Sequence, residues 1–192
     1  MCWLPLRARP IFAARIHLGF RMGLGGRVVE RSGRVPHISY RWDPETDILT
    51  GSIKAGSKKA GGLTGSVELE GSDGSFILLD VAGGAIHGVE VVVWPDVRTA
   101  TSLTPPQDVA TGDVVLPTRR SQPSVAAVEV DTALTIETNA AESVFHVRLG
   151  PPRPATVVRV ADGLLVEVDE REELAGLWLL DVPPFPADEP AL

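Results

Sequence analysis

Residues 76–94 read FILLDVAGGAIHGVEVVVW, and this stretch decides the fold. An apolar run from Phe76 to Val81 is followed by Ala82, Gly83 and Gly84, which are typical of a turn. A second apolar run extends from Val89 to Trp94. Two such runs around a glycine turn predict a β-hairpin. Because the second run is almost continuously apolar, its strand is predicted to be buried on both faces.

A similar apolar pattern recurs 88 residues later in the chain. Residues 164–167 (LLVE) fall on residues 76–79 (FILL), and residues 177–180 (LWLL) fall on residues 89–92 (VEVV). Six identical pairs share this offset, namely Asp43/Asp131, Ile48/Ile136, Thr50/Thr138, Gly62/Gly150, Gly88/Gly176 and Pro95/Pro183. We interpret the recurrence as a duplicated β-unit in which neither half buries its apolar face alone.

The expected fold is therefore all-β, with two similar four-stranded antiparallel units packed as a pseudo-twofold sandwich or a closed barrel. The predicted organisation is a basic, disordered arm (1–36), a first β-unit (37–98), a linker rich in Pro and Gly (99–123), a second β-unit (124–185) and an acidic tail (186–192). Each unit has only about sixty residues, so we expect the two units to share one core and to unfold together.

Charge is divided unevenly along the chain. The net charge is −7, but residues 1–36 hold seven arginines against Glu30, so the arm carries +6 and the rest −13. An acidic body does not favour nucleic acid as a partner. Cys2 is the sole cysteine, which excludes an intrachain disulfide. No apolar run approaches the roughly 18 residues of a membrane-spanning helix, and we expect a soluble, cytoplasmic protein without a membrane span.

The first 21 residues leave three interpretations open. Translation could begin at Met22, which would make residues 1–21 an artefact of start-site choice. Alternatively, the segment is a native disordered tail, or its arginines serve targeting or contact with a membrane surface.

The first predicted hairpin carries a family resemblance. Residues 40–49 (YRWDPETDIL) and 77–91 (ILLDVAGGAIHGVEV) resemble short bacterial domains of unknown function whose opening hairpin reads roughly Y-D-P-E-A-D-x-L-Y-I. The resemblance covers about residues 38–94 and recurs faintly in 125–182, as in a tandem duplicate with a divergent second copy. Trp42 is inserted before the Asp of the motif, and the second copy lacks the Pro-Glu of the turn. The resemblance implies the fold and brings no activity with it.

Three side chains are candidates for ligand binding: Asp43, Asp80 and His87. Asp80 and His87 flank one predicted hairpin turn and are expected to lie close enough to pair across it. Asp43 begins a carboxylate-rich segment (residues 43–47) that we interpret as turn chemistry and not as a metal site. The chain has no nucleophile-elbow motif, and we predict no catalytic residue, metal or cofactor.

The tryptophans of the two units are interpreted as core residues. Trp94 and Trp178 lie in the two equivalent closing strands but four positions out of register, so we expect them to pack in a shared core and not to form a symmetric aromatic cage. Trp42 is expected to share the inward-facing side of its strand with Tyr40 and Ile38.

The sequence favours a non-enzymatic binding or protein-interaction module of unknown specificity, whose partner is another protein or a small molecule. The alternative is a small-molecule-binding barrel or a hydrolase with a carboxylate/His site assembled in three dimensions. A polar pocket that combines Asp43 or Asp80 with a histidine would favour the alternative, and a filled interior would favour the module.

Overall fold

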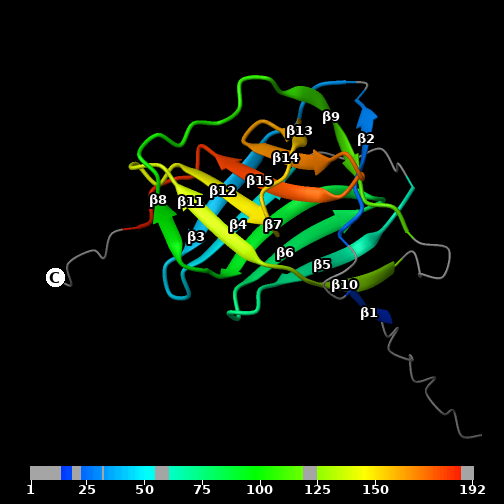
Figure 1. Cartoon of the computed structure of the whole chain (residues 1–192), viewed down its shortest axis with the longest axis horizontal. Helices are drawn as coiled ribbons and strands as arrows, with labels where there is room; N and C mark the ends of the chain where they lie inside the picture. The colour runs from blue at the N-terminus through cyan, green and yellow to red at the C-terminus, as the bar shows by residue number, and fades with distance from the viewer. Residues whose placement is uncertain (1–13, 19–22, 32, 55–60, 119–124, 187–192) are drawn as a thin grey trace, which may run out of the picture.

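The computed structural model describes residues 14–18, 23–31, 33–54, 61–118 and 125–186, and for residues 14–18 and 125 only the backbone. These residues contain strands and turns and no helix (Figure 1). None of them forms a helix with the length and hydropathy needed to cross a membrane. The expectations for residues 1–13, 19–22 and 187–192 lie outside the described residues.

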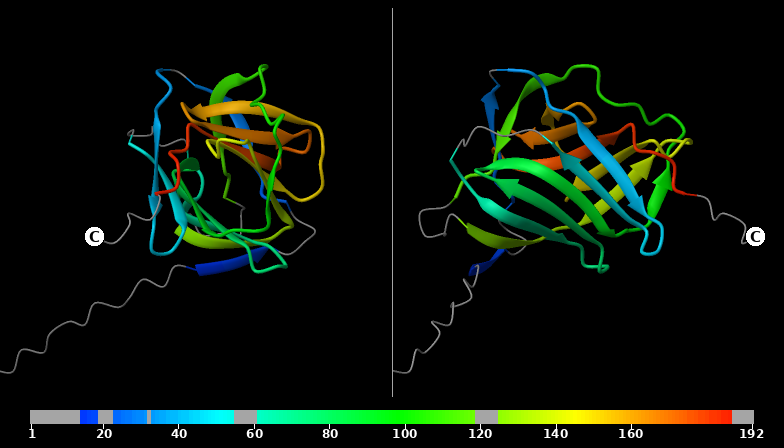
Figure 2. Two further views of the ribbon diagram at one scale, coloured as in Figure 1. Left: turned by 90° about the vertical axis from the view of Figure 1, so that its left-hand side faces the viewer. Right: turned by 180° about the vertical axis from the view of Figure 1, so that it is seen from behind.

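The strands form one mixed, strongly curled sheet that makes a half-barrel, and its two parts face each other across the core (Figure 2). The first part has the order β1-β10-β5-β6-β7-β4-β3. Its strands are β1 (Ala14–Leu18), β3 (Ile38–Asp43), β4 (Ile48–Ile53), β5 (Thr64–Glu70), β6 (Phe76–Ala82), β7 (Ala85–Val93) and β10 (Val125–Asp131).

The second part has the order β13-β14-β15-β12-β11-β8. Its strands are β8 (Val97–Thr99), β11 (Leu134–Thr138), β12 (Val144–Leu149), β13 (Ala155–Ala161), β14 (Leu164–Asp169) and β15 (Leu174–Leu180). The strand β9 (Ala110–Val115) joins the two parts, because it pairs with β7 and with β13 and also carries β2 (Arg27–Glu30).

The two parts share one hydrophobic core. Leu49 and Val91 of the first part and Val166 and Leu177 of the second are each 1% exposed or less and belong to the same buried cluster. The strand β15 is buried at every position except Leu180, as expected for a strand covered on both faces. The equivalent run in β7 alternates instead, so the expectation of burial on both faces is wrong there: Val89 and Val91 are buried, whereas Val92 on the opposite face is only half-buried.

We expected antiparallel pairing only, and this is wrong, because four of the strand pairings are parallel. The main departure is β10, which we assigned to the second unit. It lies between β1 and β5 in the first part of the sheet and runs parallel to both. The linker explains this placement: it contains β9, which belongs to the joint between the two parts, so the chain can return to the far edge of the first part before the second begins.

The second correction concerns the described residues 23–31 of the arm, which we expected to be disordered. Residues 27–30 form β2, which pairs with β9, and Leu24 is 7% exposed in the shared core. Leu24 also accepts a backbone hydrogen bond from Leu174, and Gly26 donates one to Glu172. The prediction of disorder relied on the net charge of residues 1–36 and overlooked the apolar side chain of Leu24.

The strand order repeats within the molecule. Five strands of the first part lie in the order β3-β4-β7-β6-β5, and five of the second lie in the order β11-β12-β15-β14-β13. All neighbours within both sets are antiparallel. In this correspondence β6 falls on β14 at the offset of 88, whereas β3 falls on β11 at an offset of 96. The equivalent strands therefore align only with a gap, whereas the sequence comparison aligned Asp43 with Asp131 without one.

Candidate functional site

The sequence-predicted residues do not form one site. Asp43 ends β3 and accepts a hydrogen bond from the backbone amide of Glu45 at 3.0 Å, so its carboxylate stabilises the hairpin turn. Asp80 is exposed on β6 and His87 is half-buried on β7. The β6–β7 hairpin pairs Asp80 with Gly88, the neighbour of His87. Asp43 lies near the other end of β4, because Asp43 pairs with Ile48 whereas Gly88 pairs with Ser52.

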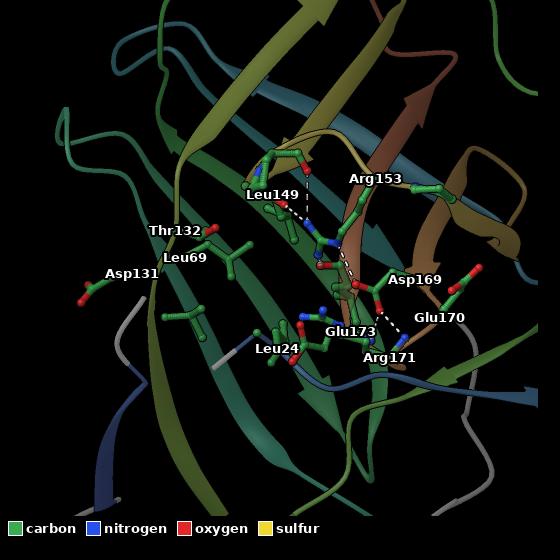
Figure 3. A pocket seen from close by; sticks show the side chains of 16 residues that line it. Leu24, Leu69, Asp131, Thr132, Leu149, Arg153, Asp169, Glu170, Arg171 and Glu173 are labelled. Carbon is green, nitrogen blue, oxygen red and sulfur yellow. Dashed lines mark hydrogen bonds and ion pairs between the residues drawn. The ribbon is translucent and has the colours of Figure 1, made fainter. Parts of the chain in front are cut away.

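A large cleft lies between the two parts of the sheet at the ends of β5 and β10 (Figure 3). Its volume is about 710 Å³. Leu69 and Val130 line one side, and the β12–β13 connection and the β14–β15 turn line the other. Charged side chains converge here, and the most enclosed pair is Arg153 with Asp169, whose side chains are 25% and 7% exposed.

Arg153 holds the cleft wall together. Its Nε donates to Asp169 Oδ2 at 2.7 Å, Nη1 donates to the carbonyl of Leu149 at 2.7 Å, and Nη2 donates to the carbonyl of Leu174 at 2.5 Å (Figure 3). Burial of the Asp169 carboxylate opposes its ionisation, but hydrogen bonds from two backbone amides and from Arg153 outweigh this, so the pKa of Asp169 is lowered. The guanidinium is thus committed to this protein's own backbone, and its role is structural.

Arg153→Ala is expected to lower the free energy of unfolding by about 3 kcal/mol, because it breaks an enclosed ion pair and leaves two carbonyls without their donor. Urea denaturation measures the change. Arg159→Ala is the matched control: Arg159 lies 3.8 Å from Asp162 in an exposed pair, so the expected loss is below about 0.5 kcal/mol. Equal losses in the two variants would contradict a structural role for Arg153.

A carboxylate/histidine pair does assemble in three dimensions, at residues that the sequence did not single out. His146 Nε2 lies 3.2 Å from Glu167 Oε1, and the indole N–H of Trp178 donates to the same oxygen at 2.8 Å. The rings of His146 and Trp178 stack with centroids 4.1 Å apart. Trp178 is buried as expected, at 6% exposed, but it packs in this cluster and not in the cluster that holds its strand neighbours Leu177 and Leu179.

The His146–Glu167–Trp178 cluster is enclosed, with His146 only 7% exposed. Burial of Glu167 opposes its ionisation, but contacts with His146 and Trp178 and the charges of His146 and Arg148 outweigh this and lower its pKa. None of the three residues lines the cleft at Arg153 or the aromatic pocket described below. Because the residues before and after each of the three in the chain belong to the shared core, the cluster lies on the opposite, outer face of the second part of the sheet.

Glu167→Gln is expected to lower the free energy of unfolding by about 1.5 kcal/mol at pH 7, the loss of charge-assisted contacts. Because the folded-state pKa of Glu167 is depressed, its stabilisation is complete above the ordinary value of 4.5 and disappears as the pH falls through the folded-state pKa. Urea midpoints of the wild type and the variant should therefore converge as the pH falls below 4.5. Glu170→Gln removes the same charge at an exposed position and should show no such convergence. The prediction would be contradicted if the difference in urea midpoint between the wild type and Glu167→Gln stayed constant with pH.

A second hollow is an aromatic pocket of about 290 Å³. Four rings line it in a contiguous row: Phe185, Trp42, Trp94 and Phe145. The centroids of Trp42 and Trp94 are 5.4 Å apart in a stacked arrangement, and Phe185 meets Trp42 edge-on at 5.1 Å. Phe145 lies 5.4 Å from Trp94. We refer to this site as the aromatic pocket.

Segments distant in the chain position these rings. Trp42 is in β3, Trp94 follows β7, Phe145 is in β12, and Phe185 follows β15. The indole N–H of Trp42 donates to the carbonyl of Pro183 at 2.8 Å, and that of Trp94 donates to the carbonyl of Asp47 at 2.8 Å. Both polar edges are thereby satisfied within the protein, which fixes the ring orientations and leaves apolar ring surface for the pocket.

The rim of the aromatic pocket comes from two hairpin turns. Asp47 lies in the β3–β4 turn with φ 57°, and Glu142 lies in the β11–β12 turn with φ 51°. Val97 of β8 completes the rim and is 40% exposed, while Phe185 is 39% exposed. Exposed apolar side chains around a hollow are a feature of many binding surfaces.

No family model and no curated protein matches the chain.

Proposed function

We propose that this protein is a non-enzymatic binding module whose recognition site is the aromatic pocket. The observation that carries the proposal is the exposure of Phe185 and Val97 at the mouth of a hollow walled by four aromatic rings. A core would enclose these side chains, whereas a recognition pocket keeps them open to solvent. The buried His146–Glu167 pair lies outside both the cleft at Arg153 and the aromatic pocket, so it does not support the alternative of a carboxylate/His hydrolase.

The indole N–H signals of the tryptophans test this function directly. In ¹H–¹⁵N spectra, titration with a panel of small aromatic and branched aliphatic probes is expected to move the Trp42 and Trp94 signals and to leave that of Trp178 in place, because Trp178 lies outside the pocket. Phe185→Ala should abolish these shifts, while Val28→Ala, at 41% exposure on β2, should preserve them. The proposal fails if no probe moves either signal.

We also propose that the two parts of the molecule arose by tandem duplication, with the pseudo-twofold relation and the kinship to the short bacterial hairpin domains that the sequence suggests. The repeated five-strand order supports this. Under the offset of 96 the β3–β4 turn corresponds to the β11–β12 turn. The aromatic pocket then lies between equivalent turns of the two copies, so that a single copy would supply only half of it.

A further inference from the structure

Among the residues that the structure describes, the charged residues that line the aromatic pocket are all acidic. Asp47 and Glu142 are both exposed at the rim, and the described part of the lining contains no Lys, Arg or His. Among the described residues neither carboxylate has an ion-pair partner. The pocket lining thus combines four aromatic rings with two acidic residues, and none of the described lining residues is basic.

Aromatic walls and a negative rim together select a particular chemistry. The face of an indole ring attracts a cation through its quadrupole, and the attraction is strongest when the cation sheds its water easily. A metal ion or a primary ammonium holds its water strongly, whereas an alkylated ammonium is both positively charged and covered by methyl groups. Such a group can contact the rings with its methyls while the rim carboxylates attract its charge.

We propose that the aromatic pocket binds an alkylated ammonium group, a proposal that rests on the binding function above. Trp42 and Trp94 supply the ring surface, and Asp47 and Glu142 supply the electrostatic attraction. The group can come from a free small molecule or from a methylated lysine side chain of a protein partner, because the head group is the same.

Choline and 3,3-dimethyl-1-butanol separate charge from shape, because the second replaces the quaternary nitrogen by carbon. Titrations followed by the Trp42 and Trp94 indole signals should give a Kd for choline about tenfold lower than for the neutral alcohol. Equal affinities would contradict the proposal that the ligand is charged, but the pocket would still be a binding site. If neither compound binds, the ammonium proposal is wrong, and the fragment panel judges the binding function separately.

Two further arms identify the source of the group and the residues that attract it. Acetyl-trimethyllysine amide binding at least tenfold more tightly than choline would assign the pocket to a protein side chain, and the reverse order would assign it to a free small molecule. The variant Asp47→Asn/Glu142→Gln should weaken choline binding about tenfold and leave the neutral alcohol unchanged. Asp80→Asn and Asp162→Asn combined make the same change of charge on exposed residues that do not line the pocket and should have little effect. Equal weakening in both double variants would overturn the role of the rim carboxylates.

Discussion

Val91→Asp is expected to unfold both parts of the sheet together. Val91 is 0% exposed at the centre of β7, where it pairs with Leu49 and Ile77 and belongs to the shared core. An unpaired carboxylate there costs several kcal/mol, and the lost packing adds to this; domains of this kind have a total stability of only about 5–15 kcal/mol. We expect the variant to lose its cooperative thermal transition in circular dichroism.

Val93, which follows two residues later in β7, provides the matched control. Val93→Asp introduces the same side chain two residues away at a position that is 47% exposed, and its transition should remain within a few degrees of the wild type. A partner mutation, Leu177→Asp in β15, should reproduce the loss from the other side of the core, because Leu177 is also 0% exposed. The shared core would be contradicted if Val91→Asp melted the first part while the environment of Trp178 stayed native.

The strands were largely predictable from the sequence, because period-2 alternation and glycine turns are local signals. The hairpin at residues 76–94 forms as expected, as β6 and β7. Depth of burial was less predictable. Val92 and Leu180 lie in the most apolar runs, yet both are only half-buried, because a residue's exposure depends on which neighbouring strands and loops cover it.

The aromatic pocket was not predictable from the same signals. Its four rings come from segments separated by up to 143 residues, and their meeting depends on how the second part of the sheet crosses the first. The sequence placed Trp42 and Trp94 in the core, and they do pack against it. Their other contacts, with Phe185 and the turn at Asp47, appear only once the fold is assembled. One signal was present in the sequence, namely a lone aromatic residue in the segment Pro184-Phe185-Pro186 outside any strand.

Gly65→Ala is expected to release β10 from the sheet. Gly65 lies in β5 with φ +131°, a conformation that residues with a side chain rarely adopt. A Cβ at this position would lie 2.2 Å from the backbone carbonyl oxygen of Ala126, its partner in the parallel pairing with β10. Backbone strain alone costs about 1–3 kcal/mol, and the clash adds to it because the atoms that the Cβ meets belong to the backbone of β10 and not to a flexible side chain.

Gly74→Ala separates these two contributions. Gly74 also has a positive φ, +85°, but nothing lies within 4 Å of its Cβ position, so its substitution meets backbone strain without a clash. Urea denaturation should show about 1–2 kcal/mol lost for Gly74→Ala and clearly more for Gly65→Ala. Hydrogen exchange should then show the amides of β10 losing protection in Gly65→Ala while those of β15 keep it. Equal losses in the two variants, with β10 still protected, would mean that β10 can move away from β5 without leaving the sheet. The absence of a side chain at position 65 would then not explain the parallel pairing that carries β10 into the first part of the sheet.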